Sequence, residues 1–354
     1  MNSLQSESRA SGLDRRPILI VPYMWIGDFV RCHSVVKLLK ARFPARPIDL
    51  LSTTLCAPLT DYMPEVRQAI VADLPRRRLP LGEHKALADR LRREGYGTAL
   101  IMPRTWKAAL APFLAGIPER TGWVGEIRFG LINDLRWGER QRPRMVDQCA
   151  ALALPANAPQ PEQWPLPELL VPGSEVVGWR ERLGVTDHRP VVALAPGAVG
   201  PSKRWPGASF AELARALSDR NCDVWVIGGP SEAPLARIIK EQAPAARDLT
   251  GTDLRNAVLA LAASTVAISN DSGLLHVAAA LGTPAIGIFG PTSPWHWAPL
   301  NPIAAAVQQT IEKLDCQPCH KPTCRVVHHR CMRNISAEHV LEIAQRTLAE
   351  ARVA

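Results

Sequence analysis

The chain has 354 residues, more than one ordinary hydrophobic core requires, and this length predicts two domains. Hydrophobic residues make up 47% of it and charged residues 21%, which excludes a chain that is disordered throughout. No apolar run reaches the roughly 18–20 residues of a membrane span, and no charged-then-apolar signal opens the sequence. We therefore expect a cytoplasmic globular protein whose residues 1–16 form a flexible tail.

Positive charge is concentrated in the first half of the chain. The formal net charge is +9, and residues 1–170 carry 24 Lys or Arg against 17 Asp or Glu, whereas residues 171–354 carry 18 against 16. A basic half attracts nucleic acid, an anionic membrane surface or an acidic substrate. Scattered charge that only maintains solubility explains the count equally well.

The first predicted strand, Pro17–Pro22, is a short apolar run bounded by prolines, as is typical of a buried parallel strand. The elements expected after it are a helix that opens at Gly27-Asp28, a strand at Ile48–Leu51, a helix at Leu87–Glu94 and a strand at Thr98–Met102. Strands that alternate with helices predict a doubly wound parallel sheet. We assign residues 17–165 to this N-terminal domain.

The pattern restarts after a proline-rich stretch, and we place a linker at residues 166–186. The elements expected in the C-terminal domain, residues 187–335, are strands at Pro190–Pro196, Asp223–Ile227, Val266–Ser269 and Ala285–Phe289 and helices at Phe210–Asp219 and Leu274–Leu281. An amphipathic helix, Ala337–Ala351, is predicted within residues 336–354. The fold class is therefore α/β, with two Rossmann-like domains facing across a cleft and ligands at the carboxyl ends of the strands.

Three strand ends of the C-terminal domain carry residues suited to anions. In Ser269–His276 a buried strand stops and a helix opens, so that backbone N–H groups and the helix dipole favour a diphosphate. Gly287–Thr292 is a second exit of this kind. The loop Ala195–Pro206 carries Lys203, whose charge suits a departing phosphate. The alternatives are that Asp271 is an ordinary helix cap and Lys203 a solvated surface lysine.

Two carboxylates are candidates for sugar chemistry. Glu232 follows a glycine-rich strand exit, where a carboxylate accepts ribose or sugar hydroxyls, but it equally suits the first turn of a helix. Asp28 follows Gly27 in the first strand-to-helix loop and is suited to take the proton of an acceptor hydroxyl, unless it is a helix cap. Three basic residues that we place in loops of this half either hold an acidic acceptor or carry ordinary surface charge: Arg104, Lys107 and Arg120.

Four of the eight cysteines cluster with the spacing C-x2-C-x4-C-x6-C: Cys316, Cys319, Cys324 and Cys331. Four thiolates suit tetrahedral zinc, although zinc ribbons usually pair two C-x2-C knuckles across a longer loop. An iron–sulfur centre and reduced structural thiols are the alternatives. No catalytic step is assigned to this cluster.

Together, five segments resemble the bacterial lipopolysaccharide heptosyltransferases, glycosyltransferase family 9, and most of all the group that adds the second heptose. The segments are Trp25–Asp28, Pro103–Ala109, Ala115–Trp123, Pro196–Pro206 and Asn270–His276. The cysteine cluster also resembles a tail of many family members. The resemblance implies the GT-B fold, with ADP-heptose bound by the C-terminal domain and a heptose- or Kdo-containing inner core bound by the N-terminal domain.

The resemblance also implies roles for single residues. Asp28 takes the place of the general base, Lys203 that of a lysine on the donor diphosphate, and Glu232 that of a carboxylate on the donor ribose. The donor-binding set is Gly197, Lys203, Glu232, Thr252, Asp271, Ser272, Gly273, His276 and Gly290. The acceptor-binding set is Gly27, Arg104, Lys107 and Arg120. At Ala198 and Val199 the chain departs from the related first heptosyltransferase, which has hydroxyl residues there, so backbone N–H groups would have to serve instead.

The resulting hypothesis is an inverting heptosyl transfer that requires no cofactor, with loosely bound Mg²⁺ as an option. The enzyme is expected as a peripheral protein on the inner face of the cytoplasmic membrane. The alternatives are the first heptosylation step, or another nucleotide-sugar transferase or epimerase of the same fold. A non-catalytic nucleic-acid or membrane-surface binder is disfavoured because the basic residues lack interleaved aromatic residues, and no nucleic-acid partner is expected.

Overall fold

A computed structural model describes residues 14–75, 78–185, 189–302, 305–308 and 314–351. The chain divides into two compact units, Met1–Pro167 (unit 1) and Glu168–Ala354 (unit 2). The boundary lies inside the range that we predicted as a linker. Most of that range is not irregular, however, since it contains helix α7 (Gly173–Arg182), whose Trp179 is buried. Residues 1–13 of the expected tail lie outside the described residues.

Unit 1 contains a six-stranded parallel sheet with the order β3-β2-β1-β4-β5-β6. Its strands are β1 (Ile18–Val21), β2 (Ile48–Ser52), β3 (Val66–Val71), β4 (Thr98–Ile101), β5 (Glu119–Trp123) and β6 (Asp134–Arg136). The three predicted strands correspond to β1, β2 and β4, which are buried along their whole length. The other three were missed because they carry polar residues and are partly exposed, so they lack a continuous apolar run.

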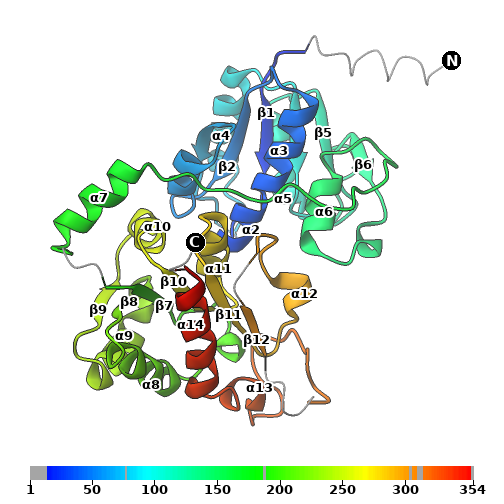
Figure 1. Cartoon of the computed structure of the whole chain (residues 1–354). Coiled ribbons are helices and arrows are strands. Elements are labelled where there is room, and N and C mark those ends of the chain that lie inside the picture. Colours follow the sequence, from blue (N-terminus) through cyan, green and yellow to red (C-terminus); the bar gives the residue numbers. More distant parts are fainter. Residues whose placement is uncertain (1–13, 76–77, 186–188, 303–304, 309–313, 352–354) are drawn as a thin grey trace. The chain divides into compact units, whose positions relative to one another are not determined.

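Helices flank this sheet (Figure 1): α2 (Ile26–Arg31), α3 (His33–Arg42), α4 (Leu81–Glu94), α5 (Trp106–Leu114) and α6 (Met145–Ala151), with 3₁₀ turns η2 (Ala57–Tyr62) and η3 (Glu139–Gln141). Helix α4 shows why the sequence folds locally in this way. Its His84, Leu87 and Leu91 recur at helical spacing and are buried, while Arg92 and Arg93 in the last turn suit the negative end of the dipole. The helix ends at Gly95, which adopts the left-handed conformation with φ of 69°.

Unit 2 repeats the same topology, with the order β12-β11-β10-β7-β8-β9. Its strands are β7 (Val191–Ala195), β8 (Asp223–Gly228), β9 (Arg247–Thr250), β10 (Val266–Asn270), β11 (Ala285–Phe289) and β12 (Ala305–Gln308). In each unit the first and fourth strands are neighbours, and the chain winds outward from them in both directions. This is the Rossmann order, and ligands of such sheets bind where the winding reverses, at the carboxyl ends of those two strands.

The helices of unit 2 after α7 are α8 (Gly207–Ser218), α9 (Ala233–Gln242), α10 (Leu254–Ala262), α11 (Gly273–Ala280), α12 (Pro294–Trp297), α13 (Arg330–Arg333) and α14 (Ala337–Ala351), with 3₁₀ turns η4 (Pro201–Lys203) and η5 (Pro230–Glu232). Helix α14, which the sequence predicted with these bounds, packs on α8 and buries Val340 and Ala344. Trp205 and Phe210 lie in the same core with their rings edge to face at 4.8 Å.

The predicted fold class is confirmed: the chain is α/β, with two doubly wound parallel sheets of the Rossmann type. In the described part of the chain, no helix is long and apolar enough to cross a membrane.

Candidate active site

The reversal point of unit 2 lies between β7 and β10, and Asn270 ties the two strand ends together. Its side-chain oxygen accepts the Trp205 backbone N–H at 3.1 Å, and its side-chain nitrogen donates to the Pro196 carbonyl at 2.8 Å. Asn270 is fully buried, so both bonds form away from water. The loop 196–206 is therefore held against the end of β10.

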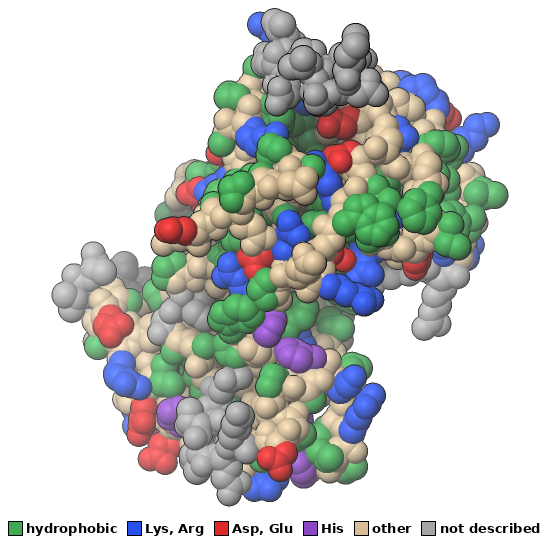
Figure 2. All heavy atoms as spheres, turned by 90° about the vertical axis from the view of Figure 1, so that its right-hand side faces the viewer, with side chains coloured by type: hydrophobic (Ala, Val, Ile, Leu, Met, Phe, Trp, Pro, Cys, Tyr) green, Lys and Arg blue, Asp and Glu red, His purple; other side chains and the backbone are tan. Residues whose placement is uncertain are grey.

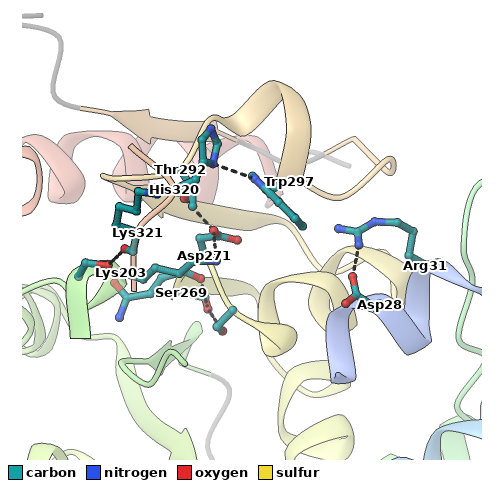
Figure 3. Close-up of polar contacts among 12 residues, drawn as sticks. Asp28, Arg31, Lys203, Ser269, Asp271, Thr292, Trp297, His320 and Lys321 are labelled. Atoms are coloured by element: carbon teal, nitrogen blue, oxygen red, sulfur yellow. Dashed lines mark hydrogen bonds and ion pairs between the residues drawn. The ribbon is translucent and has the colours of Figure 1, made fainter. Parts of the chain in front are cut away.

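Three strand exits converge on the Asp271 carboxylate. Lys203, from the loop after β7, places its Nζ 2.8 Å from Asp271 Oδ2, and Thr292, from the exit of β11, donates its hydroxyl to the same oxygen at 2.7 Å (Figure 3). Asp271 is 6% exposed and Lys203 27%. Two readings from the sequence are thereby corrected: Asp271 is not the cap of α11, and Lys203 is not an isolated surface lysine.

The N-terminus of α11 opens directly after this ion pair. Ser272 is the N-cap, in an extended conformation, and its side chain makes no capping hydrogen bond to the first-turn N–H groups. The Ser272 hydroxyl contacts that of Ser269 at 3.0 Å. Gly273 begins the helix and His276 lies one turn further, where it is buried. The positive end of the helix and the Lys203 ammonium therefore lie beside one another.

Glu232 lies over the exits of β7 and β8. A Cβ atom built on Gly197 would meet the Glu232 carboxyl carbon at 2.7 Å, and one on Gly228 would meet the Glu232 Cβ at 2.8 Å. The carboxylate accepts the Gly229 N–H at 2.9 Å, which is the helix-start role that we considered as the alternative. It also accepts the Ser231 hydroxyl at 2.7 Å. Glycine at positions 197 and 228 thus permits the close approach of this carboxylate.

Two members of the expected donor set have other local roles in the structure. A Cβ atom on Gly290 would lie 2.2 Å from the Met332 sulfur, so close packing alone requires glycine there. Thr252 follows β9, the edge strand, and donates its hydroxyl to the Leu249 carbonyl at 3.1 Å. Thr252 thus follows a strand that β8 separates from β7, the strand before the loop of Lys203.

The cysteine segment, which we define as residues 314–333, packs on the loops of this site, and sequence reasoning did not predict this. His320 donates its backbone N–H to the Pro291 carbonyl at 2.9 Å, and Ser202 donates its backbone N–H to the Pro322 carbonyl at 3.1 Å. Burial, the neighbouring His296 and the Lys203 charge lower the pKa of His320. The only signal in the sequence was that histidines lie within the cysteine spacing.

Burial distinguishes one of the four thiols of this segment from the other three. Cys331 is buried, and burial, together with Cys319, Cys324 and Cys316, raises its pKa to about 11. Within the described residues, which include all four cysteines, no group of three or more His, Cys, Asp or Glu side chains is placed to hold a metal ion.

In unit 1 the reversal point lies between β1 and β4, and Asp28 follows the first of these strands. The N-cap of α2 is Trp25, so Asp28 is a first-turn residue and the alternative of a helix cap is wrong. Its carboxylate forms an ion pair with Arg31, one turn later on the same helix, and the guanidinium of Arg31 is only 5% exposed (Figure 3). Gly27 immediately precedes it in the helix.

Of the three basic residues that we expected in loops, one lies in a loop, one in a helix and one in a strand. Arg104 does lie in the loop after β4, where its guanidinium contacts Glu139 at 3.1 Å. Lys107 instead lies in α5 and donates to the Arg78 carbonyl at 3.3 Å. Arg120 lies in β5, and its guanidinium bonds backbone carbonyls, including that of Leu131 at 2.7 Å. The loop prediction is therefore wrong for Lys107 and Arg120.

Beside Arg104 lies a cavity of about 310 Å³, lined by Arg104, Val124, Gly125, Gly138, Glu139, Arg140 and Gln141. Burial raises the pKa of Glu139, an effect that the nearby Arg104 and Arg128 oppose. Arg128 is 1% exposed and donates to the carbonyls of Trp123 and Pro103. The cavity is therefore lined by two guanidinium groups, those of Arg104 and Arg140, and by one carboxylate, that of Glu139.

Comparison with known proteins identifies the family. The model of "Glycosyltransferase family 9 (heptosyltransferase)" matches residues 84–329, more than half of the chain. The chain belongs to glycosyltransferase family 9. This family 9 enzyme is 36% identical over 340 residues to lipopolysaccharide heptosyltransferase 2 of Escherichia coli K12, with 92% of this chain and 96% of that protein covered. It is 36% identical over 348 residues to the protein of the same name from Salmonella typhimurium, with 94% and 99% covered.

Solved structures of the same family have the same fold as this glycosyltransferase. The structure of E. coli ADP-heptose lps heptosyltransferase II matches with a TM-score of 0.82 and 34% identity, covering 95% of this chain and 99% of that one. E. coli heptosyltransferase WaaC with ADP matches with a TM-score of 0.69 and 17% identity, covering 94% and 99%, and shows the fold alone. The predicted family, the GT-B fold class and the glycosyltransferase activity are thus confirmed.

Proposed function

We propose that this glycosyltransferase moves heptose from ADP-heptose to the inner core of lipopolysaccharide, as a heptosyltransferase II. The observation that carries this proposal is the convergence of Lys203, Asp271 and Thr292 beside the N-terminus of α11, in a chain 36% identical to lipopolysaccharide heptosyltransferase 2 of E. coli. A cation and a helix N-terminus together suit the diphosphate of a nucleotide sugar.

The donor occupies unit 2 in this proposal. The diphosphate lies against the first N–H groups of α11 and shares the Lys203 ammonium with Asp271. The ammonium carries three donors, so it can contact both partners at once. Glu232, which lies over Gly197, accepts ribose hydroxyls. As the glycosidic C–O bond breaks, Lys203 and the helix stabilise the charge that develops on ADP.

The acceptor is activated by Asp28. Its carboxylate takes the proton of the acceptor hydroxyl, whose oxygen attacks the anomeric carbon on the face opposite the departing ADP, and the configuration inverts. The ion pair with Arg31 orients this carboxylate and keeps it from rotating toward the helix start. Acceptor, donor and protein supply every atom of the step, so we propose that no resident metal is required.

The cavity beside Arg104 suits the acidic part of the acceptor. Its lining contributes Arg104 and Arg140 against Glu139, and the buried Arg128 lies behind it. A carboxylate or phosphate of the core sugars would displace Glu139 from Arg104, a change assisted by the raised pKa of Glu139. Arg104 thus keeps the acceptor-binding role that the sequence suggested. For Lys107 and Arg120 the contacts to backbone carbonyls point to structural roles.

Peripheral binding to the inner face of the cytoplasmic membrane fits the surface of unit 1. Hydrophobic side chains gather on part of the face shown in Figure 2, and the exposed large ones between β5 and α6 are Ile127 (87%), Phe129 (67%) and Trp137 (67%). They flank the cavity in sequence, since Gly125 and Gly138 line it. Apolar and aromatic residues beside basic ones suit the headgroup region of an anionic bilayer.

Vesicle flotation tests this proposal. Wild-type protein should float with vesicles of anionic phospholipid at low salt and be released at high salt, because screening weakens the electrostatic part of binding. The double variant Phe129→Ser, Trp137→Ser should bind these vesicles more weakly, whereas Val177→Ser, at an exposed apolar position of unit 2, should not. Equal flotation of all three proteins would refute a role for this surface.

A transfer assay tests the proposed function. Purified enzyme is given ADP-heptose and one of two truncated cores, ending either in Kdo or in a first heptose. Product on the heptosylated core alone is the expected result. Product on the Kdo core alone would assign the first heptosylation step, and loss of ADP-heptose without any acceptor would indicate an epimerase or hydrolase.

A further inference from the structure

The cysteine segment is anchored in the core of unit 2 at both of its ends. Leu314 near one end, and Cys331 and Met332 near the other, belong to the hydrophobic core that contains β10 and β11. Within the described residues, the polar contacts of the stretch between these anchors go mainly to the two loops that carry the site. The segment is therefore a fixed part of the site rather than a free tail.

The first of these loops is the one that carries Lys203. Ser202, the residue before Lys203, donates its N–H to the Pro322 carbonyl at 3.1 Å and its hydroxyl to the Lys321 carbonyl. The Ser202 carbonyl contacts His329 Nε2 at 2.6 Å. All three polar groups of Ser202 are thus held by the cysteine segment, so the segment fixes the backbone from which Lys203 extends.

The second loop follows β11 and carries Thr292. Gln317 donates its side-chain amide to the Gly290 carbonyl at 2.7 Å, and His320 donates its N–H to the Pro291 carbonyl at 2.9 Å. The indole of Trp297 donates to His320 Nδ1 at 3.2 Å (Figure 3). His320 has a positive φ of 53°, a conformation that costs a non-glycine residue energy and that these contacts maintain.

The contact with Trp297 determines which nitrogen of His320 carries hydrogen. An indole N–H can only donate, so Nδ1 of His320 must be the acceptor, and the ring hydrogen is on Nε2. His320 is exposed, so this Nε2–H is available to a ligand. The Trp297 ring neighbours both the ion pair and the imidazole: its centre is 5.7 Å from the Lys203 ammonium and 6.4 Å from the centre of the His320 ring. The charges of Lys203 and Asp271 both act on the pKa of His320.

We propose that His320 is a donor-binding residue, which gives its Nε2–H to the diphosphate of the nucleotide sugar beside Lys203. The inference rests on the proposed function of the site. It assigns a role to the cysteine segment that the cysteine spacing alone did not suggest: the segment places an imidazole donor against the anion and fixes the loop of Lys203. Trp297 orients the ring from the opposite side.

Two conservative variants of His320 distinguish direct binding of the diphosphate from support of the Trp297 side chain. In His320→Gln the amide nitrogen can occupy the position of Nε2, whereas in His320→Asn the amide oxygen can occupy the position of Nδ1 and accept the Trp297 N–H. If His320 binds diphosphate, His320→Asn should weaken ADP binding by about tenfold or more, the loss expected for a hydrogen bond to a charged group, and His320→Gln should retain most of it. If His320 only supports Trp297, His320→Gln should weaken ADP binding and His320→Asn should retain most of it.

The measurement is calorimetric titration with ADP and with AMP, using His339→Gln on the exposed face of α14 as the matched control. A larger loss for ADP than for AMP in His320→Asn would locate the contact at the terminal phosphate. Wild-type ADP affinity in His320→Asn would overturn the proposal, and so would a loss confined to His320→Gln. Failure of the wild-type protein to bind ADP at all would instead refute the proposed function, so the two failures are distinguishable.

Discussion

Units 1 and 2 share one strand order but form their sites in different ways. In unit 2, the contacts at the reversal point join residues far apart in the sequence: Lys203 pairs with Asp271, and Asn270 bonds Pro196. In unit 1, Asp28 pairs with Arg31 on the same short helix. The cavity of unit 1 comes from connections after β4, β5 and β6 rather than from the reversal point alone.

The difference suggests a division of labour. In the proposed function, the diphosphate, which is the same in every donor of its class, binds at strand exits of unit 2 that are bonded to one another. The acceptor, which varies in its sugars and acidic groups, is proposed to bind at the cavity of unit 1, which is formed by loops. Variants in the two units should therefore separate donor binding from the other steps.

The largest effect is expected from the general base. The variant Asp28→Asn keeps the shape of the side chain but cannot accept the hydroxyl proton, so kcat should fall by about 10²–10⁴-fold, while the Kd of ADP should change less than about twofold. Initial rates and ADP titration measure the two quantities. Asp89→Asn, an exposed carboxylate of α4, serves as the control. Near-normal turnover of Asp28→Asn would remove Asp28 from the mechanism.

A smaller effect is expected from the cation of unit 2. Replacing Lys203 by Gln removes a charged donor to the diphosphate, and the Kd of ADP should rise by about 10–100-fold. Acceptor KM should stay within about twofold, because the proposed acceptor site lies in unit 1. Lys240→Gln, at an exposed position of α9, is the matched control. If acceptor KM rose as much as the Kd of ADP, the division between the units would fail.

The cavity beside Arg104 predicts the reverse pattern, a change in acceptor KM without a change in the Kd of ADP. Arg104→Gln should raise acceptor KM by about tenfold and leave the Kd of ADP unchanged, since one charge-assisted contact to an acidic sugar is lost. Arg93→Gln, exposed at the end of α4, is the control. Cores with and without phosphate identify the acidic group: a phosphate ligand makes the effect of Arg104→Gln vanish on the dephosphorylated core, and a Kdo carboxylate preserves it. An unchanged acceptor KM on both cores would contradict the assignment.

The smallest effect is expected from metal removal. Because Lys203 and α11 supply the positive charge of the proposed site, treatment with EDTA should change turnover by less than about twofold. Loss of activity that Mg²⁺ restores would show that the donor binds as a metal complex. Loss that only zinc or iron restores would instead point to the four thiols of the cysteine segment.

Much of the fold was predictable because it depends on short-range pattern. The strands β1, β2, β4, β7, β8, β10 and β11 are mainly apolar and buried, most of them end at or near Pro, Gly or Asn, and they were found. Strands β9 and β6 were missed, since residues such as Arg247 and Asp134 in them are only partly buried. Pairing with a neighbouring strand, not their own composition, makes these segments strands.

The sequence by itself determined the family, the two-domain α/β organisation and the strand exits at which polar residues gather, because a strand end followed by glycine and a helix start is a local signal. Only the tertiary structure decided which of those residues meet. It joined Lys203 to Asp271 and Thr292, turned Arg120 toward backbone carbonyls, and required Gly290 for packing on Met332. It also brought His320 to the loops of Lys203 and Thr292. Such contacts depend on the order of strands in the sheet and on segments that are distant in the sequence. The spacing of residues within one motif does not encode them.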